Sequence, residues 1–101
     1  MPAADAATAG PVTRDGEALR FAGALVRERV PALWRQALPL LAGVARFDLS
    51  AVDRVDSAGV ALLAELAARA GGGGAVAVAG EPVGLAELRA AYRLQPDLAY
   101  A

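Results

Sequence analysis

Two carboxylates and one hydroxyl lie close together in the middle of the chain, and they are the residues best placed to do chemistry. Asp53, Asp56 and Ser57 fall between an apolar segment, 44–49, and an alanine-rich run that ends near Ala70. A serine in the first turn of a helix either caps the unpaired backbone N–H groups or accepts a phosphate that the helix dipole stabilises. Both interpretations stay open at this point.

The two carboxylates could act as a general acid and a general base, but no third group completes a catalytic site around Asp53 and Asp56. The two aspartates are better explained as residues that solvate the start of the helix. The sequence contains no His and no Cys, which removes the usual base of a Ser-His-Asp arrangement, thiol catalysis and the commonest transition-metal ligands. We therefore expect no catalytic residue, no metal site, no cofactor and no enzymatic activity.

Charge and hydropathy exclude two further classes of function. The 101 residues carry 10 basic and 11 acidic side chains, for a net charge of -1, and the arginines form no basic stripe for nucleic acid. No run approaches the roughly 18–20 apolar residues of a membrane span. The first ten residues lack the positive segment of a signal peptide. These features predict a cytoplasmic protein that does not insert into a membrane.

The hydrophobic periodicity predicts one α/β domain. We interpret residues 1–11 as a flexible tail and 12–101 as the domain. The expected order is β-β-α-β-α-β-α, with strands over 11–14, 18–22, 44–49 and 75–79. The expected helices cover 31–42, 57–70 and a last segment that begins at 82 or 84 and ends at 94. Parallel crossovers in the later part imply a small mixed sheet with helices packed on it.

Three other features have structural interpretations. The run Gly71–Gly74 follows a helix and opens a strand, which is typical of a connector and not of a phosphate loop. Trp34 lies at helical spacing within an apolar face and is expected to anchor the core, with an exposed partner contact as the alternative. The strand 75–79 is expected to be covered on both faces, so that Ala77→Phe would destabilise the fold.

Small residues follow the hydroxyl, since Ala58 and Gly59 come directly after Ser57. We expect them to leave the start of the helix open to another protein. A phosphate on Ser57 would add roughly −1.5 to −2 charge beside two aspartates and would repel such a partner. The residues by themselves thus predict a small binding module with a contact site that could be phosphorylated.

The segment Asp56-Ser57-Ala58-Gly59, placed between a strand and an apolar helix, resembles the signature of the STAS domain, the fold of bacterial anti-sigma factor antagonists. The chain looks most like one branch of that family, the small STAS subunit (MlaB) of the Mla phospholipid-transport ABC complex. Five stretches carry this likeness: Pro31–Trp34, Leu41–Val44, Phe47–Ser50, Arg54–Leu63 and Leu88–Leu94. The resemblance runs from about Thr13 to Leu98, which is nearly the whole domain.

The resemblance implies a non-enzymatic, cytoplasmic accessory subunit that binds the ATPase of the transporter. Such a subunit is peripheral to the inner membrane through a complex that includes a membrane permease and maintains outer-membrane lipid asymmetry. The implied contact has its centre at 56–59, that is, at Asp56, Ser57, Ala58 and Gly59, with Asp53 and Arg54 at its edge.

The family also implies an alternative, an anti-sigma factor antagonist-type switch that binds a serine kinase or anti-sigma factor and is controlled by phosphorylation of Ser57. Such antagonists often carry two adjacent hydroxyls in this turn, whereas here the second position is Ala58. Ser57 is then the sole local phosphoacceptor. At this point the transporter ATPase and the serine kinase or anti-sigma factor both remain candidate partners.

Overall fold

The computed structural model describes residues 11–70 and 76–93. Its elements are β1 (Val12–Asp15), β2 (Ala18–Leu25), the 3-10 helix η1 (Arg27–Arg29), α2 (Val30–Ala37), the 3-10 helix η2 (Leu38–Leu40), β3 (Arg46–Val55), α3 (Ser57–Ala70), β4 (Ala77–Ala79) and α4 (Leu85–Ala91). This order confirms the predicted β-β-α-β-α-β-α arrangement. The connector Gly71–Gly74 and all but the last residue of the predicted tail, 1–11, lie outside the described residues.

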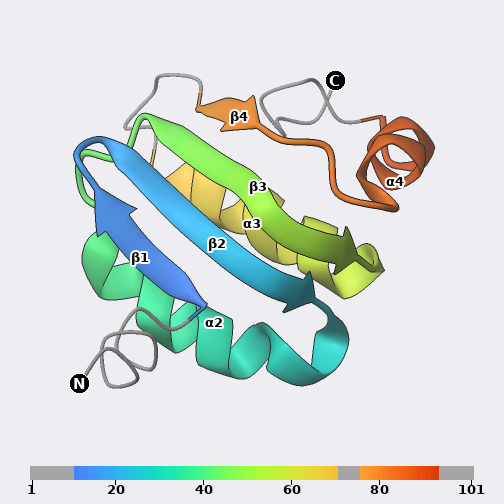
Figure 1. Ribbon diagram of the computed structural model, residues 1–101, viewed down its shortest axis with the longest axis horizontal. Coiled ribbons are helices and arrows are strands. Elements are labelled where there is room, and N and C mark those ends of the chain that lie inside the picture. Colours follow the sequence, from blue (N-terminus) through green and yellow to red (C-terminus); the bar gives the residue numbers. More distant parts are fainter. Residues whose placement is uncertain (1–10, 71–75, 94–101) are drawn as a thin grey trace.

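Four strands form one mixed sheet in the order β1-β2-β3-β4. A turn at Gly16 joins β1 and β2 into an antiparallel hairpin, whereas β2 pairs with β3, and β3 with β4, in parallel. Parallel neighbours need a crossover, and the two helices that supply it, α2 and α3, lie on the same face of the sheet (Figure 1). The predicted mixed sheet with helices packed on it is therefore confirmed.

The core lies between the sheet and these two helices. Phe21 on β2 and Phe47 on β3 are fully buried, and their rings meet edge to face with centroids 5.5 Å apart. Leu33 from α2 and Leu63 from α3 are also fully buried. Trp34 is half-buried and packs on this core, and the Arg69 guanidinium lies 5.1 Å from its ring centroid. The tryptophan thus anchors the core with one part of its ring and keeps another part at the surface.

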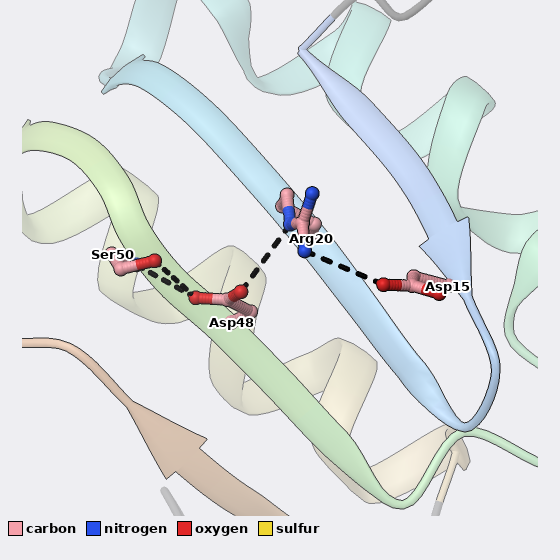
Figure 2. A network of polar contacts seen from close by, with 4 residues as sticks. All are labelled: Asp15, Arg20, Asp48 and Ser50. Atoms are coloured by element: carbon pink, nitrogen blue, oxygen red, sulfur yellow. Dashed lines mark hydrogen bonds and ion pairs between the residues drawn. The ribbon is translucent and has the colours of Figure 1, made fainter.

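The opposite face of the sheet carries charged side chains (Figure 2). Arg20 on β2 reaches Asp15 on β1 at 3.4 Å and Asp48 on β3 at 3.3 Å. The hydroxyl and the backbone N–H of Ser50 both donate to Asp48, at 2.6 and 3.0 Å, and hold the pKa of that carboxyl below its ordinary value. These contacts link three strands across a face that no described helix covers.

The third strand is longer than predicted. It runs from Arg46 to Val55, whereas the apolar pattern indicated 44–49, so Asp53 and Arg54 belong to a strand and not to a loop. Burial explains the difference, because Val52 and Val55 continue the inner face of the strand after its first six residues. Asp53 and Arg54, which lie between these two valines, interrupt the apolar pattern in the sequence.

Two other boundaries also differ from the sequence pattern. The second strand continues through Gly23 to Leu25, beyond its predicted end at residue 22, because irregular register with β3 accommodates Gly23 at φ +81°. Helix α2 ends at Ala37, and Pro39 lies in the 3-10 turn that follows. The α-helix therefore stops before its predicted end at residue 42, because a proline cannot donate the backbone hydrogen bond that would continue it.

The expectation that the last strand is covered on both faces is wrong. Within β4, Ala77 and Ala79 are exposed and Val78 is half-buried. The strand lies at the edge of the sheet order, and the two alanines lie level with Arg46 and Asp48 of β3, on the charged face. None of the described helices is long and apolar enough to cross a membrane.

Truncation of Phe47 tests the position of the core. Phe47→Ala removes a fully buried ring and its contact with Phe21, so it should lower the free energy of unfolding by about 3–5 kcal/mol. Ala77→Phe, at an exposed edge position, should change it by no more than about 0.5 kcal/mol. Chemical denaturation of both variants measures this, and a larger loss from Ala77→Phe would contradict the sheet order.

Candidate protein-interaction site

The residues singled out from the sequence meet where β3 ends and α3 begins. Val55 is the last residue of the strand and Ser57 is the first of the helix, so Asp56 alone connects them. The helix covers Ser57–Ala70, as the sequence predicts. A connection of one residue leaves little freedom, so the chain direction is set by the contacts of Asp56.

Asp56 is the cap of α3. Its Oδ1 accepts a hydrogen bond from the backbone N–H of Gly59 at 2.9 Å, and its backbone carbonyl accepts the first helical bond, from Val60, at 3.0 Å. Its Oδ2 accepts from the N–H of Arg27 at 3.0 Å. The N–H groups of Arg27 and Gly59 hold the pKa of the Asp56 carboxyl below its ordinary value. The capping role considered for Ser57 therefore belongs to its neighbour.

Ser57 occupies the first position of the helix and is exposed. The side-chain hydrogen bonds at this turn are made by Asp56, and the part of the chain that the structure describes supplies none to the Ser57 hydroxyl. No described base activates this oxygen as a nucleophile. The hydroxyl is available to a partner protein or to a modifying enzyme.

Gly59 is buried and faces the end of β2. A Cβ at this position would overlap the carbonyl oxygen of Leu25 and lie 2.8 Å from its carbonyl carbon. The glycine is thus required by the packing of α3 on the sheet, and not by the approach of a partner as its small size suggested. Because its N–H is already bonded to Asp56, neither its N–H nor a side chain is offered at the surface.

Asp53 and Arg54 are exposed at the end of β3, and neither side chain forms an ion pair with another described residue. Together with Asp56, Ser57 and Ala58 they make up what we call the α3 N-terminal surface. The structure brings these five predicted residues together within one strand end and one helical turn. It places the sixth, Gly59, beneath them.

Val83 belongs to the same neighbourhood and was missed by the sequence reasoning. It lies opposite Arg54 in an isolated parallel bridge, in which its N–H donates to the Asp53 carbonyl and its carbonyl accepts from the Val55 N–H, at 3.4 and 3.0 Å. Its side chain is 75% exposed. No local pattern marks it, because the bridge joins segments almost thirty residues apart.

The chemistry of this arrangement suits binding. Within 11–70 and 76–93, no cluster of three or more acidic side chains lies close enough to hold a metal ion. The α3 N-terminal surface offers a hydroxyl, two carboxylates and a guanidinium, and the exposed side chain of Val83 lies beside it. Such a mixture is typical of protein contacts.

The pH dependence of stability tests the cap. Because the folded-state pKa of Asp56 is lowered, its ionised form stabilises the fold above the ordinary value of 3.8, and this contribution is lost as the pH falls through the lower folded-state value. Asp56→Asn keeps one acceptor, for the N–H of Gly59, but turns the other into an amide donor that faces the N–H of Arg27, so it should lower the free energy of unfolding by about 0.5–1.5 kcal/mol at neutral pH. The difference in the free energy of unfolding between Asp56→Asn and the parent should shrink as the pH falls. Asp53→Asn is the control, and an equal loss from both variants would contradict the cap.

Addition of one methyl group tests the packing of the same turn. Gly59→Ala places a Cβ against the Leu25 carbonyl and should lower the free energy of unfolding by about 1–3 kcal/mol, measured by thermal or chemical denaturation. Ser57→Ala, exposed in the same turn, should change it by no more than about 0.5 kcal/mol. A Gly59→Ala protein as stable as the parent would mean that α3 does not approach β2 so closely.

The chain is similar to several chains of solved structures. Nine chains of solved structures match. One, described as "Crystal Structure Analysis of Mglu", is 27% identical over 72% of this chain and 19% of that chain, with a TM-score of 0.49. This chain therefore spans less than a fifth of the length of that protein. No curated protein sequence matches.

A protein-family model described as "Mlab, STAS domain" matches residues 11–98. The match covers both the sheet with its helices and the α3 N-terminal surface. The order of strands and helices, which was derived above from the residues, is consistent with that family's fold. The chain belongs to the STAS domain family.

Proposed function

We propose that this STAS domain is a non-enzymatic accessory subunit that binds the ATPase of an Mla-type phospholipid-transport ABC complex through the α3 N-terminal surface. In this proposal the chain lies in the cytoplasm, against the ATPase and its membrane permease, and supports outer-membrane lipid asymmetry. The description of the matching family model, which names Mlab, supports the choice of partner.

The exposed hydroxyl of Ser57 on a rigid backbone is the observation that carries the proposal. Asp56 fixes the turn through hydrogen bonds to Arg27 and Gly59, and its own N–H donates to the Leu25 carbonyl at 3.2 Å. Because the turn is already ordered, a partner that binds it does not lose the free energy of ordering a loop. The surface is small, polar and preorganised, as a specific docking site requires.

The charges at the edge of the surface add specificity. Asp53 and Arg54 are neighbours of opposite charge on exposed strand positions. A partner with complementary charges is favoured, whereas one with like charges is repelled. Binding to one conformation of the ATPase would also shift the population of the complex toward that conformation.

The same exposed hydroxyl favours one alternative, a partner switch of the anti-sigma factor antagonist type, in which a serine kinase phosphorylates Ser57. The carboxylate of Asp56 already accepts the N–H of Gly59. A phosphate on Ser57 would therefore meet a carboxylate beside it and would act by repulsion. In this alternative the unmodified surface binds the regulator and the phosphorylated one releases it.

A charge at position 57 tests the contact surface. Ser57→Glu adds a carboxylate beside Asp56 and should weaken binding to the purified ATPase about tenfold or more, or about 1.4 kcal/mol. Ser57→Ala should change the binding free energy by about 0.5–1.5 kcal/mol. Isothermal titration calorimetry measures both. Ala68→Glu, exposed on the same helix, is the control, and equal affinities of Ser57→Glu and the parent would exclude this surface.

Affinity purification from the native host separates the two partners. We expect the tagged chain to retain an ABC ATPase together with its permease, identified by mass spectrometry. Recovery of a serine kinase or a sigma-factor regulator in their place would overturn the transporter proposal in favour of the switch. Ser57→Ala would then abolish switching and keep kinase binding.

A further inference from the structure

The side chain of Arg29, the last residue of η1, lies against the end of β2. Its Nη1 donates a hydrogen bond to the Ala24 carbonyl at 2.8 Å. The guanidinium also packs on Gly23, where a Cβ would lie 2.6 Å from Nη1. Arg29 is half-buried and takes part in no ion pair with another described residue. Its described polar contact is therefore with the backbone of β2.

This contact closes the corner between β2 and η1. The backbone N–H of Arg29 donates to the Val26 carbonyl at 2.8 Å and forms the 3-10 turn, and the side chain adds the bond to Ala24. Residues 24–29 thus form a short loop that one residue, Arg29, joins to its own beginning. A hydrogen bond from a charged guanidinium is stronger than one between neutral groups, so we expect this closure to hold the corner firmly.

Both backbone groups that bind Asp56 from this side lie inside the closed corner. The Leu25 carbonyl accepts the N–H of Asp56 at 3.2 Å, and the N–H of Arg27 donates to the Asp56 Oδ2 at 3.0 Å. Asp56 comes directly before Ser57 and caps α3. A shift of the corner would therefore move Asp56 and, with it, the start of the helix.

We propose that Arg29 is a positioning residue for the α3 N-terminal surface, because its guanidinium fixes the corner that holds Asp56. Arg29 acts through Asp56, and the proposal assigns it no contact with the partner. The effect on Asp56 is a property of this chain alone, whereas the effect on binding rests on the proposed function.

Amide hydrogen exchange of the full chain, followed by NMR at one pH, tests the positioning. In Arg29→Ala the Arg27 amide should exchange about threefold faster or more, because its bond to Asp56 is no longer held in place. The Gly59 amide, bonded to the other oxygen of Asp56, should keep its rate. A general loss of stability would accelerate both amides alike.

Two variants complete this comparison. Arg29→Lys keeps a charged donor and should restore most of the protection of the Arg27 amide. Arg35→Ala removes an exposed arginine from the neighbouring helix α2 and should leave both amides unchanged, so it is the control for the lost charge. Faster exchange of the Arg27 amide in Arg35→Ala as well would overturn the proposal.

A methyl group at position 23 tests the same contact without removing the charge. Gly23→Ala places a Cβ against the Arg29 Nη1 and should accelerate exchange of the Arg27 amide as Arg29→Ala does. In the Arg29→Ala background it should have little further effect on this amide, because both changes act on one contact. Additive effects of the two changes, or an unchanged Arg27 amide in Arg29→Ala, would overturn the proposal.

Titration of the purified ATPase gives the functional readout. Arg29→Ala should weaken binding about threefold or more, because the partner must then order the turn, whereas Arg29→Lys and Arg35→Ala should bind like the parent. If Ser57→Glu weakens binding but Arg29→Ala does not, the role of Arg29 at this surface is overturned and the proposed function stands. If the parent itself does not bind the ATPase, the proposed function fails, and the exchange rates alone decide whether Arg29 positions Asp56.

Discussion

The double acceptance of backbone hydrogen bonds by Asp56 is the interaction on which the rest of this surface depends. One oxygen binds the N–H of Arg27, just after β2, and the other binds the N–H of Gly59, in the first turn of α3. Three separate elements thus converge on one carboxylate. Loss of this group would release the start of the helix from the strand end, and the exposed Ser57 would lose its fixed position.

Close packing supports the same turn from beneath. The approach of α3 to the Leu25 carbonyl is possible only because Gly59 has no side chain. The helix can then bury Val60, Leu63 and Leu66 against the sheet while its outer face stays exposed. The small residues of this turn were all expected to leave it accessible to a partner, but they have two different roles. Ala58 and Ser57 lie at or near the surface, whereas Gly59 serves the core.

The sequence was most informative where local rules dominate. The bounds of α3 follow from its apolar spacing, and the order of strands and helices follows from alternating periodicity. The sequence was misleading where the structure depends on pairing between segments that are distant along the chain. The end of β3 looks like a loop because Asp53 and Arg54 are charged, β4 looks buried because it is apolar, and Val83 has no local signal because only its bridge to β3 brings it beside the α3 N-terminal surface. Sheet edges and bridges depend on contacts that spacing does not encode.

Site-specific photo-crosslinking in the native host tests the central claim most directly, because it reports contacts without prior choice of a partner. A benzophenone side chain would be placed in separate variants at Ser57, at Arg54 and, as the control, at Ala77 on the exposed sheet edge. The account predicts crosslinks from positions 57 and 54 to an ABC ATPase and none from position 77. Crosslinks to the ATPase from position 77 alone, or crosslinks from position 57 to a serine kinase, would contradict it.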